Sequence, residues 1–446
     1  MKGRLFGTDG MRGIALRPPL DRATVTRLGA ALAGHLAELG QPLKILLAGD
    51  TRASTPVLAE WLGGAFRGAG GAVVWAGVLP TPAVSHLLRA DGSFGAGVVV
   101  SASHNPAADN GIKLVSAAGT KWPEAAERSL EQRLRALAAD PPVRSLGSVR
   151  TALAGRYLEL LEATLPPRPL AGVRVVVDAA NGAASPVAER FFRALGAEVE
   201  MLFAAPNGDN INAGCGSLHP GKLAQRVRAV GADAGVALDG DADRALLVTH
   251  TGRVLNGDDV LLVWARALAA ADALPGSVVV ATVMSNLGLE VALRTDGIAL
   301  ARCPVGDRAV WETMESTGAV LGGEQSGHVI NSRHAVTGDG LLTAAHVAAI
   351  AHSRRAALEE IADLQRFPQV LKNLRVAHRR PLVEVPELAA AIAAVEQRLS
   401  GSGRVLVRYS GTEPLLRVMI EAASDEQAHG AVDEIIETAK LHLGEA

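Results

Sequence analysis

Strand-like and helix-like segments alternate along most of this 446-residue chain, and this alternation restricts its fold more than any other feature. Apolar residues fall at helical spacing between residues 25 and 39, and the run Ile45–Ala48 that follows is typical of a buried strand. The pattern restarts after the proline-rich stretch 165–169, and a third cycle begins at Val278–Val280. Strands separated by helices form parallel sheets through right-handed crossovers, so we predict three successive α/β domains.

The last part of the chain follows a different pattern. The runs 383–385, 404–408 and 416–420 are strand-like, and segments with helical spacing flank them at 388–399 and 425–443. This order predicts a separate, smaller α+β domain. The four predicted domains span residues 1–152, 153–252, 253–366 and 367–446.

Composition excludes several classes of protein. Lysine and arginine number 44 against 46 aspartate and glutamate residues, whereas a dedicated nucleic-acid binder usually carries a basic excess. The cysteines, Cys215 and Cys303, are too few for a disulfide framework. The start lacks the apolar core of a signal peptide, and no uncharged apolar run approaches the roughly 18 residues that span a bilayer. We expect a cytoplasmic monomer or homodimer, with neither nucleic acid nor a membrane as partner.

A cluster of acidic residues directly after a predicted strand is the strongest local signal. Asp239, Asp241 and Asp243 stand at alternate positions, so a curled loop brings their carboxylates together around a hard cation such as Mg²⁺ or Ca²⁺. An EF-hand is excluded because Arg244 and His250 stand where it needs glycine and glutamate. The alternative is a solvated acidic turn, but carboxylates this close repel one another unless a positive group neutralises them.

Another polar loop, Ser101–Pro106, follows the strand-like run 97–100, where α/β proteins place ligands. Ser103 beside His104 suggests a nucleophile, although serine, asparagine and proline are also ordinary loop formers. A serine hydrolase is disfavoured because the Gly-x-Ser-x-Gly motif is missing around this serine.

Two further loops offer polar groups to a ligand. The segment Arg408–Pro414, with Arg417 after it, can hold a phosphate through arginine, hydroxyl and backbone N–H donors, or it is a simple hairpin turn. The segment Gly322–His328 offers a carboxylate, a hydroxyl and an imidazole to a polyol, or it is a flexible turn. A ligand in a cleft between domains would meet all of these groups, which together suggest phosphoryl transfer on a phosphorylated sugar.

The order of these motifs resembles that of the α-D-phosphohexomutase superfamily from Phe6 to Glu421. The matching segments are Phe6–Gly13, Ser101–Pro106, Asn110–Lys113, Asp239–Arg244, Val283–Gly288, Val305–Arg308, Gly322–Ile330 and Arg408–Glu421. The resemblance implies three related α/β domains with mixed sheets and a smaller C-terminal α+β domain around a central active-site cleft.

The resemblance also implies roles for individual residues. Ser103 matches a phosphoserine that donates its phosphoryl group to the sugar, with a bisphosphorylated hexosamine as intermediate and activator. One Mg²⁺ per chain would be held by Asp239, Asp241, Asp243 and an oxygen on Ser103. Lys113 and Arg12 match groups close to the phosphoserine, and His328 is a candidate acid/base. The residues implied in substrate binding are Arg244, Glu324, Ser326, Arg408, Ser410, Gly411, Thr412 and Arg417.

The string from Gln325 to Ile330 resembles the glucosamine branch of this superfamily, and a carboxylate such as Glu324 suits a cationic 2-amino group. The resemblance therefore implies an isomerase that interconverts glucosamine 6-phosphate and glucosamine 1-phosphate, on the route to UDP-N-acetylglucosamine. The alternatives are a mannose or glucose phosphomutase with the same chemistry, a magnesium-dependent sugar phosphatase and a non-catalytic phosphosugar-binding protein.

Overall fold

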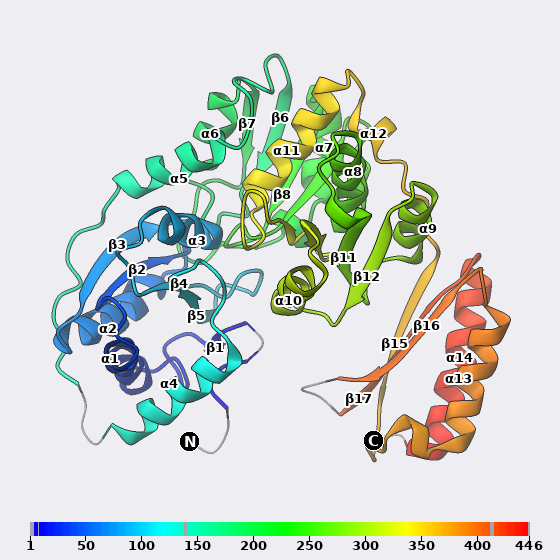
Figure 1. The fold of residues 1–446 in the computed structure, drawn as a ribbon, viewed down its shortest axis with the longest axis horizontal. Coiled ribbons are helices and arrows are strands. Elements are labelled where there is room, and N and C mark those ends of the chain that lie inside the picture. The colour runs from blue at the N-terminus through cyan, green and yellow to red at the C-terminus, as the bar shows by residue number, and fades with distance from the viewer. Residues whose placement is uncertain (1–3, 8, 138–140, 411–413, 445–446) are drawn as a thin grey trace.

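The computed structural model describes residues 4–7, 9–137, 141–410 and 414–444, and it contains four sheets, each covered by helices (Figure 1). The domains follow one another in an arc from the N-terminal domain to the C-terminal domain (Figure 1). The first three sheets mix parallel and antiparallel pairs, and the fourth is antiparallel. The predicted fold class is confirmed, whereas the boundaries between domains stay a prediction.

The first sheet has the strand order β1-β5-β4-β2-β3, with β2 parallel to β3 and β4 and with β5 antiparallel to β4 and β1. Its domain contains β1 (Met11–Ile14), α1 (Arg22–Glu38), β2 (Lys44–Gly49), α2 (Thr55–Gly68), β3 (Ala72–Val78), α3 (Thr81–Ala90), β4 (Ala96–Val100), β5 (Asp109–Ser116) and α4 (Glu124–Ala136). Because β4 ends at Val100, the loop with Ser103 lies at the carboxyl end of a central strand.

The second sheet has the order β10-β9-β8-β6-β7. Its domain contains α5 (Ala152–Glu162), β6 (Arg174–Asp178), α6 (Ala188–Ala194), β7 (Glu198–Leu202), the 3₁₀ turn Gly216–Leu218, α7 (Gly221–Val230), β8 (Ala234–Leu238), β9 (Ala245–Thr249) and β10 (Val254–Leu255). Strand β8 is buried along its whole length, and the acidic loop begins at the residue after it.

The third sheet has the order β12-β11-β13-β14. Its domain contains α8 (Gly257–Ala270), the 3₁₀ turn Pro275–Ser277, β11 (Val278–Thr282), α9 (Leu287–Thr295), β12 (Ala299–Cys303), α10 (Asp307–Thr317), β13 (Leu321–Gly323), β14 (Val329–Asn331), α11 (Gly340–Ser353) and α12 (Leu358–Ile361). The loop with Glu324 connects β13 to its antiparallel partner β14. All three domains thus present a predicted site loop at the end of an inner strand.

The C-terminal domain has a three-stranded sheet in the order β15-β17-β16. Its elements are β15 (Gln369–Arg375), α13 (Pro386–Arg398), β16 (Arg404–Tyr409), β17 (Leu415–Glu421) and α14 (Asp425–Leu443). The strand predicted at 383–385 is wrong, because Leu382–Glu384 forms a 3₁₀ turn between Pro381 and Pro386. Proline lacks the N–H group that a strand donates to its neighbour. Strand β15, which the sequence pattern did not reveal, takes its place.

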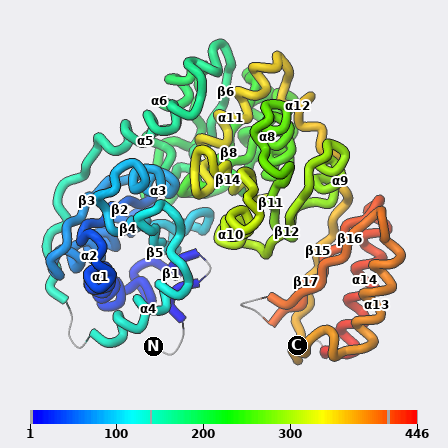
Figure 2. Tube along the Cα trace, in the orientation of Figure 1, coloured from blue at the N-terminus to red at the C-terminus, as the bar shows by residue number. Residues whose placement is uncertain are grey.

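The apolar cores divide the molecule into two bodies. One continuous cluster of buried side chains extends from Leu46 through Val175 to Val279, so the three α/β domains share it. The C-terminal domain has its own core between the sheet and α13 and α14, which lie on the side of the sheet away from the other domains (Figure 2). Among the described residues, no helix has both the length and the apolar character needed to cross a membrane.

Helices α1 and α2 pack so closely at Gly29 that this position predicts a sharp response to substitution. A Cβ atom there would lie 2.1 Å from the backbone oxygen of Leu62. We expect Gly29→Ala to lower the free energy of unfolding by about 1–3 kcal/mol, because overpacking forces the two helices apart. Gly221→Ala, at the start of α7, is the matched control, because a Cβ there meets nothing within 4 Å. Thermal unfolding of both variants tests this, and equal melting temperatures would contradict the close approach.

Candidate active site

Ser103 lies in a strained and tightly held loop. Its backbone adopts a left-handed φ of 51°, which is uncommon for a residue other than glycine and typical of functional sites. The Ser103 N–H donates to Ser101 Oγ at 3.0 Å, and the side chain is buried. The loop therefore fixes where the Ser103 hydroxyl points.

Two side chains from outside this loop hold its backbone. Arg52 Nη2 donates to the carbonyl oxygens of Asn105 at 2.6 Å and of Ser103 at 3.3 Å. Asn212 Nδ2, from the second domain, donates to the same two oxygens at 3.0 and 2.9 Å. Arg52 is fully buried and pairs with Asp50, which also accepts from Ser101 Oγ at 2.6 Å. Sequence analysis missed these residues, because Asn212 is far from Ser103 in the chain.

The three aspartates converge as predicted. One oxygen from each of Asp239, Asp241 and Asp243 lies within 4.8 Å of the others, and all three residues are buried. Ser103 Oγ donates to Asp239 Oδ2 at 2.6 Å, so the nucleophile candidate lies against the cluster. Burial, and then the charges of Asp243 and Asp241, raise the pKa of Asp239 well above its usual value.

This cluster fits a divalent cation. Among the described residues, the buried oxygens Asp241 Oδ1 and Asp243 Oδ1 have no hydrogen-bond partner. Buried acceptors are normally satisfied, and carboxylate oxygens are the ligands that hard cations prefer. A bound cation would supply both the missing partner and the missing charge. The buried cluster therefore fits a metal site.

Lys113 lies against the aspartate cluster, and Arg12 lies against the loop that carries Ser103. Lys113 Nζ, on β5, lies 2.8 Å from Asp241 and 3.1 Å from Asp9. Burial acts to lower the pKa of Lys113, but the carboxylates of Asp241, Asp9 and Asp243 outweigh it and raise that pKa above its usual value. Lys113 is thus an ammonium group. Arg12 Nη1 donates to Ala102 O and Asn105 Oδ1, and its Nη2 pairs with Asp9.

Asp9, to which the sequence assigned no role, lies beside a contact between the first and third domains that Lys121 makes. It accepts a hydrogen bond from Lys121 Nζ at 2.8 Å, and Lys121 also contacts Asp307, at the start of α10, at 3.0 Å. Burial acts to raise the pKa of Asp9, but Lys113, Lys121 and Arg12 hold it well below its usual value. Asp9 is therefore a carboxylate that balances several cations.

His328 is buried and faces the aspartates. Its Nε2 accepts the Gly338 N–H at 3.0 Å, so the ring carries its proton on Nδ1, which lies 3.6 Å from Asp243 Oδ2. Both ring nitrogens therefore contact the protein, and this geometry favours a role in orienting Asp243. Arg244 Nε lies 3.7 Å from Asp243 Oδ1, which keeps this guanidinium at the rim of the cluster.

The loop Gly322–His328 is held at its base by contacts with other parts of the third domain. Glu324 is buried and accepts the Gly306 N–H at 3.0 Å, whereas Ser326 is exposed. Gln325 Nε2 points to Asp258 Oδ2, at the start of α8, at 3.4 Å. Gln325 therefore contacts the scaffold, and Glu324 and Ser326 are the side chains of this loop that could meet a ligand.

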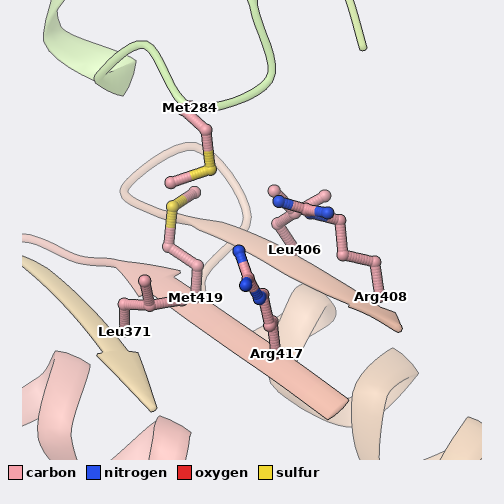
Figure 3. A pocket seen from close by; sticks show the side chains of 6 residues that line it. All are labelled: Met284, Leu371, Leu406, Arg408, Arg417 and Met419. Carbon is pink, nitrogen blue, oxygen red and sulfur yellow. The ribbon is translucent and has the colours of Figure 1, made fainter. Parts of the chain in front are cut away.

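The side chains predicted to hold a phosphate, Arg408 and Arg417, lie on the face of the C-terminal sheet that α13 and α14 do not cover (Figure 3). Arg408 and Arg417 pair across β16 and β17, and they line a small pocket together with Met284, Leu371, Leu406 and Met419 (Figure 3). Burial, and then the charge of Arg417, lower the pKa of Arg408. Two guanidinium groups held this close suit an anion between them. Ser410 is buried near them, whereas Gly411 and Thr412 lie outside the described residues.

The sequence matches all four domain models of one family, phosphoglucomutase/phosphomannomutase. The α/β/α domains I, II and III match residues 3–140, 156–252 and 256–367, and the C-terminal domain matches 371–438. Phosphoglucosamine mutase from Solibacter usitatus is 47% identical over 99% of both chains. The phosphoglucosamine mutase from Koribacter versatilis is 44% identical over 99% of this chain and 97% of that protein.

Solved structures share the fold along nearly the whole chain. A phosphoglucomutase/phosphomannomutase family protein from Burkholderia thailandensis superposes with a TM-score of 0.83 at 26% identity, covering 98% of this chain and 97% of the other. N-acetylphosphoglucosamine mutase from Aspergillus fumigatus, in complex with GlcNAc-6P and magnesium, has a TM-score of 0.65 at 18% identity, covering 99% of this chain and 96% of that one. At that identity the second likeness concerns the fold alone.

The unpaired aspartate oxygens predict that a divalent cation stabilises the folded protein. Added MgCl₂ should raise the melting temperature, because a ligand of the native state stabilises it by about 2.7 kcal/mol at a hundred times its dissociation constant. Asp241→Asn should abolish most of this rise. Asp233→Asn, before β8 and outside the cluster, is the control and should respond like the parent protein. An equal rise in all three proteins would place the cation elsewhere.

Proposed function

Because the chain belongs to the phosphoglucomutase/phosphomannomutase family, we propose that it is a phosphoglucosamine mutase, an isomerase that interconverts glucosamine 6-phosphate and glucosamine 1-phosphate. The full-length similarity to phosphoglucosamine mutases supports this branch of the family. The observation that carries the chemistry is the 2.6 Å hydrogen bond from Ser103 Oγ to Asp239 within the buried carboxylate cluster. The product would feed the synthesis of UDP-N-acetylglucosamine.

Ser103 carries the phosphoryl group in the proposed reaction. The free hydroxyl of the bound sugar phosphate forms a new O–P bond as the bond between Ser103 Oγ and phosphorus breaks. The proton that the sugar hydroxyl loses balances the one that Ser103 Oγ gains, so Ser103 is a free hydroxyl again after transfer. The resulting hexosamine 1,6-bisphosphate turns around in the cleft and returns its other phosphoryl group to Ser103. The strained loop supports this role, because its backbone is already held by Arg52 and Asn212 and needs no rearrangement before transfer.

Asp239, Asp241 and Asp243 would hold one Mg²⁺, with an oxygen of phosphorylated Ser103 as a further ligand. When bound, this ion neutralises negative charge on the transferred group. Lys113, against the aspartate cluster, and Arg12, against the Ser103 loop, add positive charge near Ser103, and in this arrangement both groups stabilise the transferred phosphoryl oxygens. His328 keeps Asp243 in place, and Arg244 at the rim is available to the sugar or its phosphate.

Substrate binding is proposed to use two loops on opposite sides of the reacting group. Arg408 and Arg417, with Ser410, Gly411 and Thr412, hold the phosphate that does not react. Glu324 and Ser326 contact the sugar hydroxyls, and the buried carboxylate of Glu324 suits the cationic 2-amino group of glucosamine. This carboxylate supports glucosamine over glucose and mannose as the preferred sugar.

Phosphorus NMR with purified protein tests the proposed reaction directly. With Mg²⁺ and a trace of hexose 1,6-bisphosphate, glucosamine 6-phosphate should convert to glucosamine 1-phosphate faster than glucose or mannose 6-phosphates convert. Preferential conversion of another sugar would retain the chemistry and refute the assignment to glucosamine. Release of inorganic phosphate as the main product would identify a phosphatase instead.

Removal of the nucleophile should abolish turnover. We expect Ser103→Ala to lower kcat at least about a thousandfold, because no other group can carry the phosphoryl group between the two half-reactions. Ser316→Ala, on the exposed end of α10, is the control and should leave kcat unchanged. Mass spectrometry should find phosphate on Ser103 in the parent protein, and substantial activity of the alanine variant would refute the phosphoserine.

A further inference from the structure

The loop Val283–Leu287, between β11 and α9, forms hydrogen bonds with the C-terminal domain. Arg404, at the start of β16, donates from Nη1 to Val283 O and from Nη2 to Ser285 O, both at 3.0 Å. Glu421, at the end of β17, accepts the Leu287 N–H at 3.2 Å. The loop belongs to a motif, Val283–Gly288, to which the proposed chemistry gives no role.

The same loop also holds the linker that leads into the C-terminal domain. Asn286 Nδ2 donates to Phe367 O at 2.9 Å, and Asn286 Oδ1 accepts the Phe367 N–H at 2.9 Å. The Asn286 N–H in turn donates to Asp258 Oδ2, at the start of α8, at 2.9 Å. The loop is thus fixed to the third domain on one side and to the C-terminal domain on the other.

Arg404 and Glu421 bind each other as well as the loop. Arg404 Nε donates to Glu421 Oε2 at 2.7 Å, and Glu421 is 0% exposed. A buried ion pair with additional hydrogen bonds is costly to break, because one charge is left without its partner. Since the C-terminal domain has a separate core, its orientation depends on such polar contacts.

The pair Arg404–Glu421 is connected to the pair Arg408–Arg417 by a single ladder of side chains. Arg404 pairs with Glu421, Leu406 with Met419, and Arg408 with Arg417 across β16 and β17. Residues two apart along a strand lie on the same face, so the three pairs follow one another over about 13 Å. Met284, from the loop, lies over the middle pair (Figure 3).

We propose that Arg404 and Glu421 are positioning residues, which set where Arg408 and Arg417 meet the phosphate that does not react. This inference rests on the proposed function, because it assigns that phosphate to the arginine pair. Arg404 and Glu421 hold one end of β16 and β17 on the Val283–Leu287 loop. Arg408 and Arg417 lie further along the same two strands, where they would meet the substrate. Neither Arg404 nor Glu421 touches substrate in this arrangement.

The test compares Arg404→Lys and Glu421→Gln with the parent protein. Lysine retains the charge beside Glu421 but cannot donate to both carbonyl oxygens as the guanidinium does. Arg398→Lys is the matched control, because Arg398 forms an exposed pair with Glu434 at 2.6 Å on the far helices of the same domain. Two acceptors of the phosphoryl group are compared. Glucosamine 6-phosphate carries a phosphate that Arg408 and Arg417 would bind, whereas glucosamine carries none.

For both test variants, the KM for glucosamine 6-phosphate should rise about tenfold. The rate at which glucosamine removes the phosphoryl group from phosphorylated Ser103, followed by mass spectrometry, should remain that of the parent. Arg398→Lys should match the parent with both acceptors. The conservative lysine variant keeps the test valid if Glu421→Gln does not fold.

Two results would overturn the inference. An unchanged KM for glucosamine 6-phosphate in both test variants would show that Arg404 and Glu421 do not position Arg408 and Arg417. An equal loss with both acceptors would show a general structural defect instead. Failure of the parent to convert glucosamine 6-phosphate would refute the proposed function itself, and is distinguishable because it concerns the unmodified protein.

Discussion

Three buried aspartates have carboxylate oxygens within 4.8 Å of one another, and their mutual repulsion must be offset by neighbouring positive charge or by protonation. Lys113, on β5, and Arg244, at the end of the acidic loop, bring positive charge to the three aspartates. Ser103, from a loop of the first domain, donates a hydrogen bond to Asp239. Within the cluster, Asp241 Oδ1 and Asp243 Oδ1 have no hydrogen-bond partner among the described residues. The site therefore fits a cation, and it needs a fixed arrangement of the first two domains, which the shared core supplies.

The two bodies of the molecule have different tasks. The three α/β domains share one core and hold the Ser103 loop in place, as the proposed phosphoryl transfer requires. In the proposed reaction, the C-terminal domain contributes the arginine pair Arg408 and Arg417, which would hold the phosphate that does not react. A polar, hydrogen-bonded contact at Val283–Leu287 suits this division, since it fixes orientation without merging the two cores.

Sequence patterns predicted the parts of the site that lie on one continuous segment. The spacing of Asp239, Asp241 and Asp243 after a buried strand was sufficient, because the loop geometry brings alternate carboxylates together. The roles of Asn212, Arg52 and Asp9 could not be predicted in this way, because only the folded chain brings Asn212 and Arg52 to the Ser103 loop and Asp9 to Lys113. The strand β15 was missed because its buried residues, Val370 and Leu374, alternate with a mixture of polar and apolar side chains.

The separate apolar core of the C-terminal domain has a consequence for how the chain comes apart. Its buried residues are separate from the core that the three α/β domains share, and among the described residues the linker and the Val283–Leu287 loop connect the two parts through hydrogen bonds. The C-terminal domain can therefore unfold, or separate from the Val283–Leu287 loop, while the three α/β domains stay folded. A phosphosugar bound by both the α/β domains and the C-terminal domain would couple their unfolding. Substrate would then stabilise the C-terminal domain as well as the α/β domains.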